Sequence, residues 1–175
     1  MGTHEYRQEL YPEQYRDAYE KYVAGLKAAG IDPLINQNTD LPVYNIAICG
    51  SRIGREYYRR FRKYPMRADY LPKILGEPRA DACQILIAHN PLYFEEYAAW
   101  GADVVVSGHV HGGIMRLPVL GGVLSPNLSL FPKYDGGRFE LGKAVMILSR
   151  GIGTHTIPLR IFNPAELVVL DFKKV

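Results

Sequence analysis

The sequence predicts an α/β fold with at least some parallel strand pairing. Two short and largely β-branched runs bounded by turn residues, at 84–88 and 103–107, indicate buried strands. Between them, residues 91–100 have the pattern of a helix that Gly101 would end. Alternation of strand, helix and strand is typical of parallel pairing, because the helix returns the chain to the same end of the sheet.

The elements before this unit follow from residue spacing. Apolar residues at helical intervals predict a first helix from about Pro12 to Ala29, and Gly30 would stop it. Strands are expected near residues 34–36 and 43–48, and a short helix is expected near 68–75.

The pattern changes to strands and loops after Gly113. The expected strands lie at residues 117–120, 143–149, 156–161 and 166–172. A run of strands joined by loops favours antiparallel pairing in this part of the chain. Asp135 and Glu140 fall in a glycine-rich segment, which we expect to be a solvated loop.

Composition favours a single domain that spans residues 1–175. The chain has a formal net charge of +3, and 47% of its residues are apolar, which is enough for a substantial core. No apolar stretch approaches the roughly 18 residues of a membrane span, and the first residues lack the apolar part of a signal peptide. We therefore expect a soluble protein, cytoplasmic or peripheral to a membrane. Cys49 and Cys83 are expected as buried reduced thiols.

Three histidines follow the two central strands. His89 comes directly after the first strand, and His109 and His111 follow the second. In extended backbone, residues two apart point the same way, so His109 and His111 could reach one site. Imidazole binds zinc, iron, nickel and copper, and also manganese where carboxylates share the site. The spacing therefore indicates a metal site without identifying the metal, whereas a lone histidine is more often a hydrogen-bonded surface or core residue.

The segment Gly108–Gly113 resembles the G-H-x-H-G-G block of the calcineurin-like metallophosphoesterases, a family of two-metal phosphate-ester hydrolases. The likeness continues at residues 149–153, 158–160 and 163–167. That order is similar to the bacterial branch that includes membrane-associated phosphoesterases acting on lipid or cell-envelope substrates. The first residues resemble the family's G-N-H-E motif, with Thr3 in place of asparagine. The family's earlier blocks, D-x-H and G-D-x-x-D, have no counterpart, so the resemblance is to the C-terminal half only.

The resemblance implies the C-terminal part of a four-layer α/β/β/α sandwich with mixed sheets, as a truncated domain. It implies His89 and His109 as ligands of one metal ion and His111 as a ligand of the other. Thr3 stands where the family has its asparagine ligand, although a hydroxyl is a poorer donor than an amide carbonyl. His4 would be the uncoordinated catalytic histidine beside the substrate phosphate.

The chemistry of the complete site requires acidic ligands. Two divalent cations roughly 3.5 to 4 Å apart repel each other strongly, and a bridging carboxylate offsets that repulsion. Three neutral imidazoles cannot do so. We therefore expect two ions, manganese, zinc or iron, in the complete domain and one or none in this chain, which alone would be slow or inactive.

Residues 52–67 combine cationic and aromatic side chains. The cations are Arg52, Arg55, Arg59, Arg60, Arg62, Lys63 and Arg67. Arg59 and Arg60 are the candidate contacts to a substrate phosphate or an anionic lipid head group. The alternative interpretation is a solvated lobe whose aromatic rings pack inward, because arginine stems often cover apolar surface.

The sequence thus predicts a metal-dependent phosphoesterase that hydrolyses phosphate mono- or diesters, including lipid-linked ones, in its complete form. One alternative is an inactive metal-binding or oligomerisation remnant of the same fold. Another is a module that binds anionic lipid, with nucleic acid the less favoured partner. Because half a sandwich would leave strand edges and an apolar sheet face open, we also expect a homo-oligomer.

Overall fold

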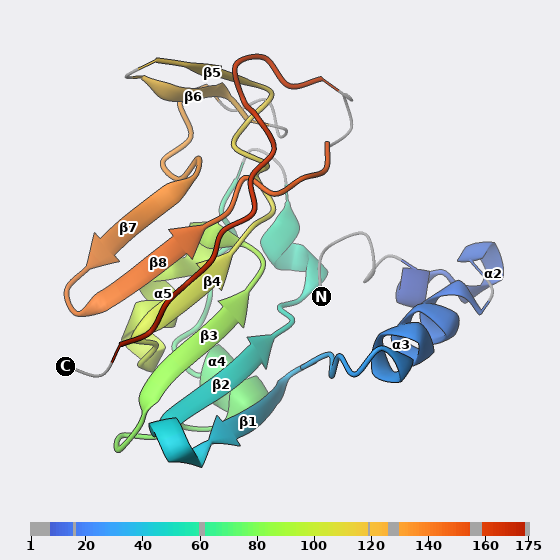
Figure 1. Cartoon of the computed structure of the whole chain (residues 1–175), viewed down its shortest axis with the longest axis vertical. Helices are drawn as coiled ribbons and strands as arrows, with labels where there is room; N and C mark the ends of the chain where they lie inside the picture. Colours follow the sequence, from blue (N-terminus) through green and yellow to red (C-terminus); the bar gives the residue numbers. More distant parts are fainter. Residues whose placement is uncertain are drawn as a thin grey trace.

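The computed structural model describes residues 8–15, 17–59, 62–118, 120–125, 130–154 and 159–173. It is a mixed α/β structure built on one six-stranded sheet (Figure 1), which confirms the predicted fold class. In spatial order the strands are β1 (Gln37–Leu41), β2 (Ile46–Ser51), β3 (Cys83–Ala88), β4 (Val104–Ser107), β8 (Ala144–Leu148) and β7 (Gly137–Leu141). The four inner strands are parallel, and the edge strands β1 and β7 are antiparallel to their neighbours.

Two short helices, α4 (Tyr70–Leu75) and α5 (Phe94–Trp100), cover one face of the sheet (Figure 1). The short 3₁₀ helices are η1 (Pro42–Tyr44), η2 (Arg55–Tyr58) and η3 (Pro91–Tyr93). Helix α5 follows η3 and ends at Gly101, which adopts the left-handed conformation that glycine tolerates. The predicted strand, helix and strand unit is therefore confirmed, with β3 and β4 parallel.

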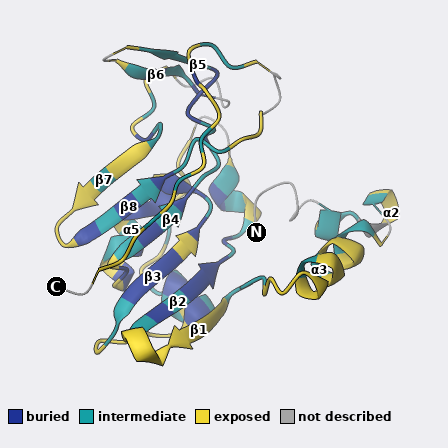
Figure 2. Ribbon diagram, viewed as in Figure 1, coloured by how far each residue is buried: buried dark blue, intermediate teal, exposed yellow. Residues whose placement is uncertain are grey.

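The predicted first helix is divided into two, α2 (Pro12–Tyr15) and α3 (Ala18–Ala28). Asp17 stands at the N-cap of α3, a position that aspartate favours over a helix interior. Both helices project away from the sheet, and α3 contains no buried residue (Figures 1 and 2). Packing therefore does not impose one continuous helix on this segment. None of the described helices has the length and apolarity that crossing a membrane requires.

The core lies between the sheet and the helices α4 and α5. One row of paired residues crosses the four inner strands on this face, and all of them are buried: Cys49, Leu86, Val105 and Met146. Tyr97 of α5 is fully buried against them and donates its hydroxyl to the backbone oxygen of Asn90. Both cysteines are free, as expected, but only Cys49 is buried, whereas Cys83 is half-buried. Burial raises the pKa of the Cys49 thiol to about 11. The inner strands are accordingly mostly dark blue and teal in Figure 2.

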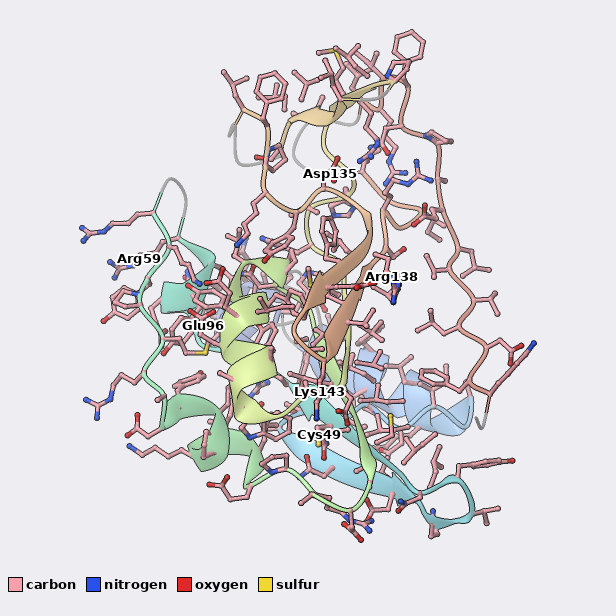
Figure 3. The ribbon with its side chains drawn as sticks, turned by 90° about the vertical axis from the view of Figure 1, so that its left-hand side faces the viewer. Cys49, Arg59, Glu96, Asp135, Arg138 and Lys143 are labelled. Atoms are coloured by element: carbon pink, nitrogen blue, oxygen red, sulfur yellow. The ribbon has the colours of Figure 1, made fainter. Side chains whose placement is uncertain are left out.

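The opposite face of the sheet is apolar but only partly covered. Ile87, Val106 and Ile147 form one paired row on it, and Ile87 is 43% exposed. The segment 159–173 lies on this side, away from α4 and α5 (Figures 1 and 3). It contains no regular strand, so the strand expected at 166–172 is wrong.

Several other strand predictions need correction. The expected strands at 34–36 and 43–48 lie three residues later, as β1 and β2. A hairpin of β5 (Met115–Leu117) and β6 (Gly121–Leu124) replaces the single strand expected at 117–120. Of the strand expected at 156–161, residues 156–158 lie outside the described residues, and Ile161 forms an isolated bridge with Met115.

The sequence predicts a solvated loop around Asp135 and Glu140, whereas the structure has the strand β7 at Gly137–Leu141. It is a polar edge strand, and Arg138 and Glu140 form an ion pair on it. Its one inward aromatic ring, Phe139, packs edge-on against Tyr134 at 5.0 Å between centroids. Charged edge strands of this kind resist pairing with other molecules. The strand at 143–149 is confirmed as β8, but it is parallel to β4, so the tail is not wholly antiparallel.

Because the two faces of β3 differ in burial, substitutions at neighbouring positions should lower the stability by different amounts. Leu86→Ala removes a side chain that is 0% exposed, so the free energy of unfolding should fall by about 3 kcal/mol. Ile87→Ala removes one that is 43% exposed, so the loss should be about 1 kcal/mol or less. Urea unfolding followed by circular dichroism measures both values. Equal losses would contradict the partly open face.

Candidate metal centre

The candidate site lies where the parallel strands β3 and β4 end. His89 follows β3 directly, and His109 lies two residues beyond the end of β4. Because parallel strands end at the same edge of a sheet, the two imidazole rings lie next to each other. Their centroids are 5.1 Å apart, with an angle of 68° between the ring planes, and both residues are half-buried. The structure therefore brings these two predicted ligands together.

Tyr58, at the end of η2, completes this cluster. Its ring lies edge-on to His109, with centroids 5.2 Å apart, and 6.5 Å from the ring of His89. Sequence reasoning missed Tyr58, because nothing in the sequence distinguishes it from Tyr57, which is buried in the core. The difference arises from the 3₁₀ turn, which directs adjacent side chains to different surroundings.

His111 is placed differently from the expectation. The strand β4 ends at Ser107, so His109 and His111 are not in extended backbone, and that part of the prediction is wrong. Both residues adopt left-handed conformations, with φ of +71° and +50°. Such angles are uncommon for residues other than glycine, and they cluster at functional sites. The ring of His111 lies beside Gly153, since a Cβ there would be 3.9 Å from its Cε1 atom.

Three side chains hold the backbone oxygens of the turn at 111–113. We call Arg116, Arg160 and Asn163 the carbonyl clamp. Arg116 donates to the oxygen of Gly112 at 3.2 Å, and Asn163 donates to the oxygens of His111 and Gly113 at 2.7 Å each. Arg160 also donates to the oxygen of His111, at 3.4 Å.

Two ion pairs surround the clamp. Arg116 pairs with Asp135 at 3.0 Å, and Asp135, labelled in Figure 3, also accepts a hydrogen bond from the backbone of Gly122. Arg150 pairs with Glu166, whose side chain is 22% exposed. Burial tends to raise the pKa of Glu166, but the hydrogen bonds from Arg150 outweigh it and hold this pKa below its usual value. Asp135 therefore has a structural role rather than that of a solvated loop residue.

The donor chemistry fits part of a metal centre. Two neutral imidazoles on adjacent strand ends suit one divalent ion of the first transition row or zinc. Among the described ranges, however, no three histidine, cysteine, aspartate or glutamate side chains form a group that could hold a metal ion. The described residues therefore offer a ligand pair and not a complete set.

The remaining predicted site residues are placed as follows. Thr3, His4 and Arg60 lie outside the described residues. Arg59 is exposed, directly follows Tyr58 and places its guanidinium 5.5 Å from the ring centroid of Tyr64. In Figure 3 Arg59 and Glu96 lie on the same side of the molecule. Glu96 pairs with Lys63 at 2.7 Å, so the positive charge of this region is partly neutralised.

Comparison with known proteins adds independent information. An uncharacterized metallophosphoesterase of Campylobacter jejuni is 29% identical over 177 residues, which cover 99% of this chain and 41% of that protein. An uncharacterized metallophosphoesterase of Aquifex aeolicus is 35% identical over 91 residues, covering 51% of this chain and 32% of that protein. The phosphodiesterase YaeI of Escherichia coli is 27% identical over 146 residues, covering 83% and 49%.

These relatives carry the names metallophosphoesterase and phosphodiesterase, which supports the family that the sequence resembles. The chain spans less than half the length of each of these three relatives. No protein-family model matches it. No solved structure matches it either.

The Arg150–Glu166 pair predicts a pH-dependent contribution to stability. Since the pKa of Glu166 is lowered on folding, its stabilisation is present above the ordinary pKa of about 4.3 and is lost as the pH falls through the folded value. Glu166→Gln should therefore lower the free energy of unfolding by about 1 kcal/mol at pH 7 and by almost nothing near pH 3.

Urea unfolding at both pH values measures this difference. Glu140→Gln is the matched control, because Glu140 pairs with Arg138 on an exposed edge and should change stability little at either pH. A Glu166→Gln loss that persists undiminished at pH 3 would contradict the assignment.

Proposed function

We propose that residues 1–175 form one domain of a metal-dependent phosphoesterase that hydrolyses phosphate mono- or diesters. The observation that carries the proposal is the adjacent pair His89 and His109 at the ends of parallel strands. The names of the relatives, metallophosphoesterase and phosphodiesterase, agree with this proposal. Both names describe hydrolysis of a phosphate ester.

In this proposal the histidines have distinct roles. His89 and His109 bind one ion, and His111 binds the second ion of a two-metal site. Divalent ions supply a water of lowered pKa and neutralise charge on the phosphate. His4 donates a proton to the leaving oxygen, and Thr3 is a weak oxygen ligand. We expect manganese, zinc or iron, with two ions in the complete site and one or none in this chain.

The basic segment at 52–67 supports an anionic substrate. Arg59 is exposed and directly follows Tyr58, whose ring contacts both imidazoles, and its guanidinium could pair with a phosphate that binds there. Arg60 is proposed to act with it. A lipid-linked phosphate ester, met by a protein peripheral to the membrane, is the substrate class that we favour within the family.

A second candidate function is binding of anionic lipid without catalysis. The positive charge of the same segment favours it, although Lys63 and Arg67 are paired with Glu96 and Asp69. Self-association is a further part of the proposal. The partly exposed row of Ile87, Val106 and Ile147 offers an apolar face that a second copy of the chain could cover.

The function is tested with the complete gene product and two esters, p-nitrophenyl phosphate and bis(p-nitrophenyl) phosphate. With manganese present we expect hydrolysis of at least one ester, and EDTA should abolish it. His109→Ala should lower kcat/KM by roughly 100-fold or more, because losing a ligand costs at least as much as losing an outer-shell partner.

His155→Ala is the matched control, since His155 lies outside every motif that carries the resemblance, and it should leave kcat/KM unchanged. Hydrolysis that survives EDTA would contradict the metal-dependent mechanism. Binding of manganese or of anionic vesicles without any hydrolysis would favour the inactive remnant or the lipid-binding module.

A further inference from the structure

The turn that carries His111 is a strained segment. His111, Gly112 and Gly113 are three consecutive residues in the left-handed region, with φ of +50°, +71° and +87°. For a residue with a side chain this conformation is unfavourable, because its Cβ comes too close to the following carbonyl oxygen. Glycine adopts it freely, but histidine does not. The conformation of His111 therefore requires contacts that compensate for the cost.

Asn163 supplies the shortest of these contacts. Its Nδ2 atom donates hydrogen bonds to the backbone oxygens of His111 and Gly113, at 2.7 Å each. The side chain is 2% exposed, although it comes from a segment without regular secondary structure. Two hydrogen bonds of this kind contribute a stabilisation of the same order as the strain, so together they can offset it.

The Oδ1 atom of Asn163 also lies close to the turn, beside Gly112. A Cβ at Gly112 would lie 2.6 Å from Oδ1 of Asn163 and 2.7 Å from Cγ of Arg150. This oxygen is buried and has no hydrogen-bond partner among the described residues. Burying Oδ1 without a partner costs free energy. The two hydrogen bonds that Nδ2 donates must therefore outweigh this cost.

We propose that Asn163 is a positioning residue for His111. By holding the carbonyl oxygens on both sides of Gly112, it fixes the turn and so sets the direction of the His111 imidazole. Groups that hydrogen-bond to a metal ligand orient it, and losing one typically weakens metal binding 10- to 100-fold. Asn163 would have the same effect through the backbone of the turn, whose carbonyl oxygens it holds. The inference rests on the proposed function, in which His111 binds a metal ion.

The test compares zinc binding at individual histidines. The complete gene product is labelled with [¹³C]histidine, and the ring resonances of His89, His109 and His111 are assigned with single alanine variants and followed during zinc titration. In Asn163→Ala, the zinc dissociation constant reported by His111 should rise 10- to 100-fold. The constant reported by His89 and His109 should change by less than about threefold, because their rings lie at strand ends that Asn163 does not contact.

Asn38→Ala is the matched control. Asn38 also donates one side-chain hydrogen bond to a backbone oxygen, that of Leu75 at 2.8 Å, but on the edge strand β1. It should leave all three constants unchanged. Asn163→Ser, which keeps one short donor, should give an intermediate constant at His111 and serves as the test if Asn163→Ala does not fold.

The outcomes separate the two proposals. Unchanged binding at His111 in the Asn163 variants would overturn the positioning role and leave the proposed function in place. Equal weakening at all three histidines would show general destabilisation and would also overturn it. Failure of every one of these histidines to respond to zinc in the unsubstituted protein would overturn the proposed function together with the inference.

Discussion

The parallel pairing of β3 with β4 is the interaction on which the candidate site depends. If the two strands were antiparallel, His89 and His109 would lie at opposite edges of the sheet. The pairing is held by burial on one face, where Leu86 and Val105 are opposite each other and fully buried. The helix α5 connects the strands and covers that same face (Figure 1). The core therefore determines where the two imidazoles meet.

The sequence revealed this unit because its signals are local. Buried β-branched runs, a helix that ends at Gly101 and histidines directly after the strands can all be recognised without knowledge of distant contacts. The polar edge strand β7 could not be recognised, since its residues alternate charge with a single aromatic ring and resemble a loop. The identity of that strand depends on pairing with β8.

Backbone conformation and contacts between distant residues also escaped prediction. The extended backbone expected at His109 and His111 is replaced by left-handed conformations, and the turn at His111 is held by partners more than 40 residues away. Asn163 and Arg160 meet His111 across 52 and 49 positions in the sequence. Tyr58 reaches the histidines from another segment again. Such partners are set by the tertiary fold, and a single sequence carries no direct signal for them.

The described residues supply part of the ligands that a two-metal site needs and part of the cover that the apolar sheet face needs. Among the described residues the imidazoles belong to no group of three potential metal ligands, and one apolar sheet face is only partly covered. Two like-charged ions would need anionic ligands to remain close together. The chain is also shorter than its relatives, of which it spans 41%, 32% and 49% in the three compared. An imidazole pair by itself therefore does not make a two-metal site.

The central claim is that His89 and His109 bind the same metal ion. X-ray absorption spectroscopy of the zinc-loaded protein tests it most directly, because imidazole rings give characteristic multiple scattering. The account predicts at least two imidazole nitrogens at about 2.0 to 2.1 Å from zinc, and one fewer in His109→Ala. A spectrum without imidazole scattering, or one that His109→Ala leaves unchanged, would contradict it.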